Sequence, residues 1–198
     1  MTNKIEKICV FCGANKGIKQ IYADAARQFA SVLLQAKIEL IYGGANIGLM
    51  GEIADEMLIH GGKVIGVMPQ FLVEKEVAHT RLNKLYIVKS MHERKEMMFN
   101  LADAFVMLPG GTGSLDEFFE IITWAQLGFH NKPRGILNVD GYYDYLLKFI
   151  EHAVSECFLT TAHKNRILVE EKPEKLIKLL WNYNDPLQDR WQLEGSTL

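Results

Sequence analysis

The segment Leu108–Glu120, LPGGTGSLDEFFE, joins a glycine-rich loop to a group of carboxylates. It follows an apolar stretch typical of a strand and leads into a stretch with helical periodicity. Glycines in such a loop let the backbone approach a ligand closely, and the unpaired N–H groups at the start of the helix bind phosphate. The predicted phosphate-binding residues are Gly110, Gly111, Gly113 and Ser114, whose hydroxyl adds one more donor.

Three acids, Asp116, Glu117 and Glu120, follow this loop within about two helical turns. Glu117 and Glu120 share a helix face, whereas Asp116 is rotated about a hundred degrees from Glu117. Acids in a first turn also complement the helix dipole, which is the simpler interpretation for Asp116 and Glu120, although Glu120 stays a candidate binding residue. Glu117 is the predicted catalytic carboxylate, because it can bind sugar hydroxyls, activate water or stabilise a cationic sugar. The predicted ligand is a nucleoside monophosphate or a sugar phosphate.

A second glycine loop, Tyr42–Gly51 (YGGANIGLMG), also follows a strand-like stretch and opens a helix. Gly43, Gly44 and Gly48 are its candidate phosphate-binding residues, and two such loops in one sheet favour a phosphate site. The Gly-Lys-Ser/Thr sequence of a P-loop is missing. The glycine spacing also differs from the dinucleotide fingerprint, and no acid ends the next strand, so a nicotinamide-dependent oxidoreductase is disfavoured.

Basic residues occur in the segment Ser90–Met97, SMHERKEM, which is predicted to begin a helix near the same edge of the sheet. Ser90 and Glu93 have the S-x-x-E spacing of a capping box. Arg94 and Lys95 are candidates to neutralise the phosphate and to balance the acids, because a guanidinium makes bidentate contacts with oxyanions. The alternative interpretation is a solvated, charged helix face.

Strand-like and helix-like stretches alternate along the chain. Strands are expected at about 5–13, 38–42, 63–68, 84–88, 104–108 and 133–139, and helices at about 18–36, 46–59, 91–101, 113–127, 142–154 and 173–183. This order predicts an α/β fold with a Rossmann-like open, mostly parallel sheet and helices on both faces. Residues 1–198 are predicted to form a single domain, with a core of about 7–183 and a polar C-terminal tail, 184–198. The site is expected in the loops after Phe11, Tyr42 and Leu108, beyond the carboxyl ends of the strands.

Composition and charge exclude several classes of protein. The 198 residues carry a net charge of -2 without a block of Lys and Arg, so no nucleic-acid partner is expected. The N-terminus has no apolar signal segment and the apolar runs are too short to span a bilayer, so a cytoplasmic protein with no membrane partner is expected. The cysteines are too few for a disulfide framework, and Cys9 and Cys12 should face opposite sides of a strand. The histidines lack metal-ligand spacing, so no metal site and no cofactor are expected.

The stretch PGGTGSLDE resembles the PGGxGTxxE signature of the Lonely Guy family, the cytokinin riboside 5′-monophosphate phosphoribohydrolases, often labelled lysine decarboxylase-like. CVFCG, YGGANIGLMG, MPQFLVEKEVAH, SMHERK and ITWAQLGFHNKP accompany it in the right order, so the resemblance covers roughly Lys7 to Val169. It implies a Rossmann-like homodimer that hydrolyses the N-glycosidic bond of AMP or N6-substituted AMP. The products would be the free base and ribose 5-phosphate.

The resemblance also implies roles for individual residues. It makes Arg94 and Glu117 the catalytic pair. It assigns the loop from Gly110 to Ser114 to the phosphate or the ribose, with Lys95 close by. The presence of both members of the catalytic pair favours an enzyme over a protein that only binds nucleotides.

Four further positions are informative within this resemblance. Glu76 and Thr123 match positions that line the nucleotide site. Ser114 stands where threonine is usual and keeps the hydroxyl. Thr112, within the binding loop, stands where an aromatic residue is frequent, so the packing of the base or sugar is expected to differ there.

Two other activities are alternatives to this one. Pyridoxal chemistry needs a Schiff-base lysine and a partner for the pyridine nitrogen, and Lys95 beside Arg94 offers no such context. A non-catalytic nucleotide-binding protein on the same fold is the remaining alternative, because a fold and a phosphate loop do not by themselves establish turnover.

Overall fold

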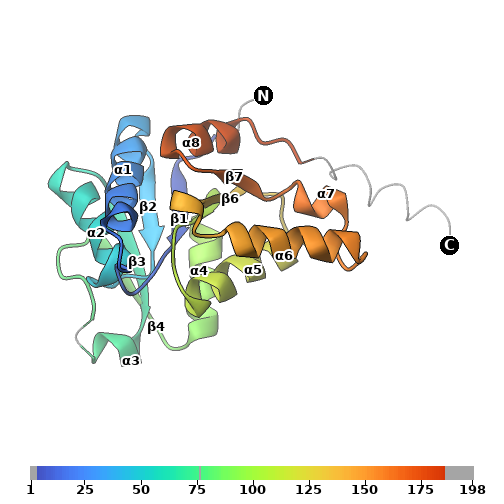
Figure 1. Cartoon of the computed structure of the whole chain (residues 1–198). Coiled ribbons are helices and arrows are strands. Elements are labelled where there is room, and N and C mark those ends of the chain that lie inside the picture. Colours follow the sequence, from blue (N-terminus) through green and yellow to red (C-terminus); the bar gives the residue numbers. More distant parts are fainter. Residues whose placement is uncertain (1–3, 76, 186–198) are drawn as a thin grey trace.

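The structure, a computed structural model, describes residues 4–75 and 77–185. In this part of the chain, one parallel sheet has the strand order β4-β3-β2-β1-β5-β6-β7 (Figure 1). Its strands are β1 (Lys7–Phe11), β2 (Glu39–Tyr42), β3 (Val64–Pro69), β4 (Lys84–Val88), β5 (Ala104–Met107), β6 (Arg134–Leu137) and β7 (Leu168–Glu170). The parallel pairing and the alternation of strands with helices confirm the predicted Rossmann-like α/β class.

The central strand β1 is buried on both faces. Ile8 and Val10 belong to one apolar cluster, whereas Cys9 and Phe11 belong to the cluster on the other face. A strand covered on both sides has a continuous apolar sequence, as this one does. Cys12 packs with the first cluster, so the prediction that Cys9 and Cys12 face opposite sides is confirmed.

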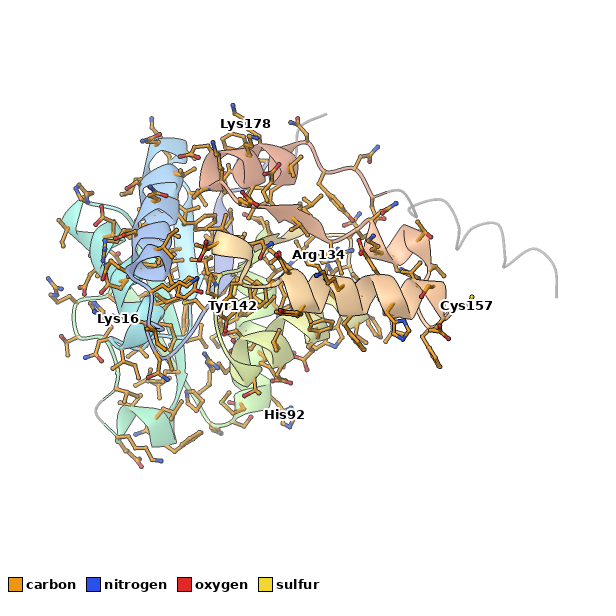
Figure 2. The ribbon with its side chains drawn as sticks, in the orientation of Figure 1. Lys16, His92, Arg134, Tyr142, Cys157 and Lys178 are labelled. Carbon is orange, nitrogen blue, oxygen red and sulfur yellow. The ribbon has the colours of Figure 1, made fainter. Side chains whose placement is uncertain are left out.

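Helices cover both faces of the sheet (Figure 1). One cluster contains side chains of α1 (Gln20–Ala36), α2 (Gly48–Ile59) and α8 (Pro173–Trp181), and the other contains side chains of α4 (Met91–Leu101), α5 (Thr112–Gln126) and α6 (Asp144–Ser155). Short helices occur at α3 (Gln70–Val73), η1 (Val139–Gly141) and α7 (Thr161–Lys164). Cys157 lies exposed just past the outer end of α6 (Figure 2).

Several boundaries differ from the sequence-based expectations. The helix expected at 18–36 begins at Gln20, and the one expected at 46–59 begins at Gly48. The strand expected at 133–139 ends at Leu137, because the chain then turns into η1. The short elements α3, α7 and β7 are not predicted, since three or four residues carry too little periodicity to identify. Of the expected C-terminal tail, residues 186–198 lie outside the described residues.

The strand order creates a switch point between β1 and β5. The chain adds β2, β3 and β4 on one side of β1, and then crosses over so that β5 pairs with the other side. The loops after β1 and β5 therefore leave the sheet in opposite directions. In open α/β sheets the crevice between such loops is where ligands bind.

Candidate active site

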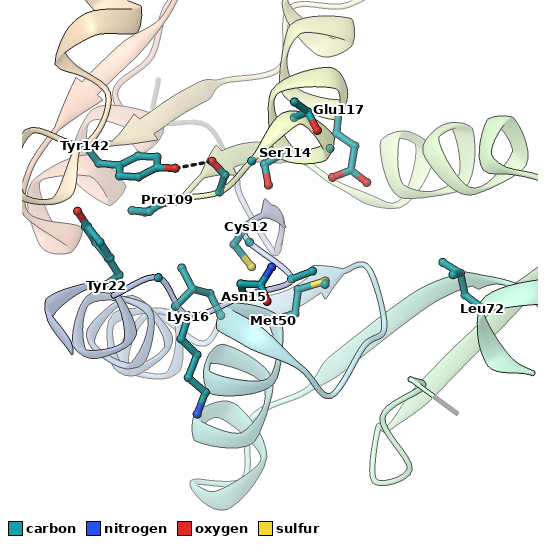
Figure 3. A pocket seen from close by; sticks show the side chains of 18 of the residues that line it. Cys12, Asn15, Lys16, Tyr22, Met50, Leu72, Pro109, Ser114, Glu117 and Tyr142 are labelled. Atoms are coloured by element: carbon teal, nitrogen blue, oxygen red, sulfur yellow. Dashed lines mark hydrogen bonds between the residues drawn. The ribbon is translucent and has the colours of Figure 1, made fainter. Parts of the chain in front are cut away.

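A cavity of about 460 Å³ lies at this switch point. Its walls are the loop after β1 (residues 12–17) and the loop after β5 with the first turn of α5 (residues 109–114). Tyr22, Leu49, Met50, Leu72, Arg94, Glu117 and Tyr142 complete the lining (Figure 3). The sequence-based expectation placed the site beyond the carboxyl ends of the strands, and the loops after Phe11 and Leu108 are the ones that form it.

The N-terminus of α5 opens into the cavity. The helix begins at Thr112, and its N-cap residue, Gly111, makes no side-chain capping bond. The first N–H groups of the helix therefore have no side-chain partner and carry the positive end of the helix dipole. A Cβ at Gly111 or Gly113 would meet no atom within 4 Å, so this turn is open toward the cavity. These features suit a phosphate group.

Close packing fixes the loop that leads into α5. A Cβ on Gly110 would overlap the Oγ of Ser114 and lie 3.0 Å from the backbone nitrogen of Gly13. Only a glycine lets the loops after β1 and β5 come this close. Ser114 is almost completely buried, and its hydroxyl is directed at the cavity (Figure 3). The predicted loop residues, 110–114, are thus brought together at one end of the cavity.

Arg94 and Glu117 form a buried ion pair between α4 and α5. The Nη1 of Arg94 donates to the Oε1 of Glu117 at 2.7 Å, and each side chain is 10% exposed. The Nε of Arg94 also donates to the carbonyl oxygen of Val67 at 3.0 Å, which fixes the guanidinium to the end of β3. Because Arg94 is buried and reaches the cavity, it is not part of a solvated charged face.

Two opposing effects act on the Glu117 carboxyl. Burial raises its pKa above the usual value, while the guanidinium of Arg94 favours the ionised form and Asp116 disfavours it. The net direction is upward. An ionised carboxylate held by a guanidinium in a buried position suits the stabilisation of developing positive charge.

The cap that positions Arg94 follows the predicted sequence pattern. The Oγ of Ser90 accepts a hydrogen bond from the N–H of Glu93 at 3.1 Å, as a capping box requires. The carboxylate of Glu93 accepts from the N–H of Lys89 at 2.7 Å, one residue before the N-cap. The first turn of α4 is therefore held from both sides, and Arg94 is one turn inside it.

Among the described residues, the predicted site residues Lys95, Glu120 and Thr123 lie away from the cavity. The Nζ of Lys95 is 3.3 Å from a carboxylate oxygen of Asp116 and 3.1 Å from one of Glu120, so Lys95 joins α4 to the outward side of α5. Thr123 is exposed, and its hydroxyl donates to the carbonyl oxygen of Phe119. Glu76, the remaining predicted contact, lies outside the described residues.

The glycines of the loop after β2, Gly43, Gly44 and Gly48, lie behind the cavity. A Cβ on Gly43 would overlap the guanidinium of Arg94, and a Cβ on Gly48 would overlap the backbone of Ala14. Gly44 has a φ of +84°, which other residues rarely adopt. None of the three lines the cavity in the described part of the chain. Because β2 is one strand away from the switch point, the loop after it does not reach the cavity. Its glycines instead leave room for Arg94 and Ala14, which line the cavity.

Several cavity residues were not singled out from the sequence. The loop after β1 carries a signal, since Gly13 and Gly17 flank Asn15 and Lys16 after a strand. However, the Nζ of Lys16 is 2.5 Å from a carboxylate oxygen of Glu52, away from the cavity (Figure 3). Tyr22 and Tyr142 also line the cavity, but no local pattern marks either tyrosine as functional.

Residues 4–75 and 77–185 contain no group of three or more His, Cys, Asp or Glu side chains placed to hold a metal ion. None of their helices is both long and apolar enough to cross a membrane.

Known structures are similar to this fold at low sequence identity. A molybdenum cofactor binding protein from Rippkaea orientalis has a TM-score of 0.68 at 20% identity, covering 89% of this chain and 96% of that one. The molybdenum cofactor carrier protein of Chlamydomonas reinhardtii has a TM-score of 0.65 at 16% identity, covering 91% of this chain and 100% of that one. At such identities the similarity shows the fold alone.

Sequence relatives are much closer. The chain matches the family described as "possible lysine decarboxylase" over residues 50–180. It is 45% identical to a probable cytokinin riboside 5′-monophosphate phosphoribohydrolase of Oryza sativa subsp. japonica, over 91% of this chain and 80% of that protein. It is 40% identical to a cytokinin riboside 5′-monophosphate phosphoribohydrolase of Arabidopsis thaliana, over 97% of this chain and 86% of that protein. The chain therefore belongs to the Lonely Guy family, the cytokinin riboside 5′-monophosphate phosphoribohydrolases that the lysine decarboxylase-like family includes.

Proposed function

We propose that this protein hydrolyses the N-glycosidic bond of a nucleoside 5′-monophosphate, AMP or N6-substituted AMP, to the free base and ribose 5-phosphate. The observation that carries the proposal is the buried Arg94–Glu117 pair one helical turn behind the open N-terminus of α5. Ser114 and Glu117 are three residues apart in one helix, about 4.5 Å along its axis. This spacing suits a phosphate at one residue and the reacting carbon of its sugar at the other.

The chemistry follows from the charge that develops on the sugar. As the bond from the anomeric carbon to the base breaks, the ribose becomes oxocarbenium-like and positively charged. Ionised Glu117 stabilises that charge and orients the water whose oxygen adds to the anomeric carbon. Arg94 keeps the carboxylate in place and contacts the substrate close to the reaction centre. The bonding electrons and one proton leave with the base.

The base is proposed to occupy the other end of the cavity. Met50 of α2 and Leu72 of α3 present apolar side chains to the cavity, and Leu72 lies on the side away from Tyr142 (Figure 3). An apolar wall suits the flat face of a purine and an apolar N6 substituent. Thr112 is smaller than the aromatic residue frequent in the family, so it leaves more room beside the loop. These features support AMP or an N6-substituted AMP as the substrate, in line with the names of the relatives.

Decarboxylation of an amino acid does not fit these residues. Pyridoxal chemistry needs a lysine amine that is free to form a Schiff base. Among the described residues that line the cavity, Lys16 is the only lysine, and its ammonium pairs with Glu52. Lys95 pairs with two carboxylates outside the cavity.

We further propose a homodimer in the cytoplasm. Large apolar side chains are exposed on α6 and after α5, including Phe149 at 63% and Phe129 at 73%. An exposed apolar surface of this kind supports association between copies of the chain. Cys9, Cys12 and Cys157 are free thiols, which suits a reducing compartment. Light scattering of the purified protein measures the assembly.

The deciding experiment incubates the purified protein with AMP and, separately, with isopentenyl-AMP, followed by chromatography. We expect free base and ribose 5-phosphate from the wild type, and the two rates rank the two substrates. Glu117→Gln keeps the shape of the side chain and removes its charge, so it should lose about 10²- to 10⁴-fold in turnover. Glu120→Gln is the matched control, since this carboxylate lies outside the cavity.

Two outcomes would contradict the proposal. Full turnover by Glu117→Gln would remove this residue from the mechanism. Intact nucleotide in every tube, with binding seen by calorimetry, would identify a non-catalytic nucleotide-binding protein instead.

A further inference from the structure

In the loop that enters α5, the carbonyl oxygens of Leu108, Pro109 and Gly110 each accept a hydrogen bond from a different donor. The carbonyl oxygen of Leu108 accepts a hydrogen bond from the buried Tyr143 hydroxyl at 2.8 Å. The next carbonyl oxygen, of Pro109, accepts from the N–H of Gly13 at 3.0 Å. A carbonyl oxygen turned toward the cavity would repel an anion. Both hydrogen bonds instead direct these oxygens to donors of the protein.

The third carbonyl is held by a side chain that itself lines the cavity. The Tyr142 hydroxyl donates to the carbonyl oxygen of Gly110 at 2.8 Å (Figure 3). The Tyr142 ring has edge-on contacts with Tyr22 and Tyr143, with ring centroids 5.4 and 4.8 Å apart. The ring is therefore fixed between α1 and the start of α6. Its exposed fraction is 41%.

The Gly110 carbonyl controls the direction of the next N–H group. The carbonyl of Gly110 and the N–H of Gly111 belong to one planar trans peptide, so they point in opposite directions. Glycine on both sides of this peptide leaves it free to rotate as a unit. A Cβ at Gly111 would meet nothing within 4 Å, so packing around that residue does not prevent the rotation. The hydrogen bond from the Tyr142 hydroxyl opposes this rotation, because it holds the Gly110 carbonyl oxygen.

We infer that Tyr142 is a positioning residue for phosphate recognition: by holding the Gly110 carbonyl, it keeps the Gly111 N–H directed at the 5′-phosphate. This inference rests on the proposed role of residues 110–114 as the phosphate loop. Tyr142 touches neither the reacting carbon nor the base in this arrangement. Its effect is confined to the affinity for the phosphate end of the ligand.

The test is Tyr142→Phe, which keeps the ring contacts and removes the hydroxyl. Loss of one neutral hydrogen bond should raise the KM for AMP about 3- to 10-fold with kcat within about twofold of wild type. The kcat/KM for adenosine, which lacks the phosphate, should stay unchanged, so the preference for nucleotide over nucleoside falls. Tyr145→Phe is the matched control, because Tyr145 is 84% exposed and lies outside the cavity.

A purely structural role predicts a different pattern. It would lower kcat for AMP and kcat/KM for adenosine together, and it would lower the melting temperature. Either this pattern or an unchanged KM for AMP in Tyr142→Phe would overturn the inference.

Calorimetry with ribose 5-phosphate separates this inference from the proposed reaction. Tyr142→Phe should weaken ribose 5-phosphate about 3- to 10-fold and leave ribose binding unchanged, whether or not the wild type hydrolyses AMP. Binding that depends on Tyr142, in a protein without turnover, would refute the reaction and support the positioning role. Absence of any ribose 5-phosphate binding by the wild type would overturn the positioning role itself.

Discussion

Gly43 and the guanidinium of Arg94 fill adjoining space behind the cavity, so that a Cβ on residue 43 would overlap the Nη2 of Arg94. The guanidinium has little freedom to move aside, because its Nε is bonded to Val67 and its Nη1 to Glu117. The lack of a side chain at Gly43, just after β2, therefore leaves room for the Arg94–Glu117 ion pair. A substitution there should damage the site more than the fold.

Gly43→Ala should therefore lower kcat/KM about 10²-fold, because a displacement of about 1 Å in a catalytic group has that effect. Its melting temperature should fall less than that of a variant that removes Arg94 or Glu117, because both members of the pair remain and only the end of one side chain must shift. The measurement is steady-state kinetics combined with thermal unfolding. In a double-mutant cycle, Gly43→Ala should cost little in the background of Glu117→Gln, because both act on one pair. Additive losses of kcat/KM in the double mutant would show that Gly43 does not act through the Arg94–Glu117 pair.

The pH dependence should report the pKa of Glu117. Burial raises this pKa above the ordinary value of 4.5, so the carboxylate takes up its proton at a higher pH than an exposed glutamate does. If the ionised form is the active one, kcat/KM falls as the pH falls through that raised pKa. Arg94 favours the ionised form and Asp116 opposes it. Arg94→Gln should move the acid limb to higher pH, and Asp116→Asn should move it slightly lower.

Comparison of the pH–rate profiles of these variants with that of the wild type separates the ionisation of Glu117 from that of the substrate. The phosphate of the substrate has its own ionisation, which is the same for every variant. An acid limb that stays in place in both variants would mean that Glu117 is not the titrating group.

Ser114 should contribute to phosphate affinity through its hydroxyl. A hydrogen bond to a charged group is worth about 1.5–3 kcal/mol, so Ser114→Ala should raise the KM for AMP about 10- to 100-fold. Ser114→Thr, which restores the residue usual in the family, keeps the hydroxyl and should stay near wild type. Equal KM values in all three proteins would remove the hydroxyl from phosphate recognition.

Lys16 should contribute little, although it lies in a loop that lines the cavity. Its ammonium is paired with Glu52, so we expect N–H groups and a hydroxyl, rather than this lysine, to hold the phosphate. Lys16→Ala should leave the KM for AMP within about threefold of wild type, the scale of an exposed ion pair. A rise of tenfold or more, with a strong dependence on salt, would show that Lys16 leaves Glu52 to bind the substrate.

Stability should depend on a second buried ion pair, distant from the chemistry. Arg166 and Asp185 pair with side chains 6% and 3% exposed, and Arg166 also donates to the carbonyl oxygen of Ala125 at the end of α5. Asp185→Ala leaves a buried guanidinium without this counter-charge and should lower the free energy of unfolding by about 3–5 kcal/mol. Glu151→Ala removes an exposed pair with Lys164 and should cost less than about 1 kcal/mol.

Denaturant unfolding of the two variants makes this comparison. The activity of the folded Asp185→Ala protein should remain close to wild type. Equal unfolding free energies for the two variants would show that the buried pair adds no more stability than the exposed one.

Local sequence was sufficient for the features that depend on a few neighbouring residues. The alternation of apolar stretches predicted a parallel α/β sheet, because strands buried on both faces need apolar residues throughout. The glycine loop predicted a helix start at Gly113, and α5 begins one residue earlier, at Thr112. Binding of an anion at this helix start stays a prediction. The spacing of Ser90 and Glu93 predicted the start of α4, because a cap is formed within one turn.

The tertiary structure decided which of the candidate residues meet. Arg94 and Lys95 are adjacent in sequence, but neighbours in a helix point about a hundred degrees apart, so only Arg94 faces the cavity. Tyr142 reaches the phosphate loop because β6 pairs with β5, a relationship with no local signature. The sequence by itself determined the class of fold and the glycine loop at the start of α5. Side-chain direction and strand order, which are set by packing of the whole sheet, determined the members of the site.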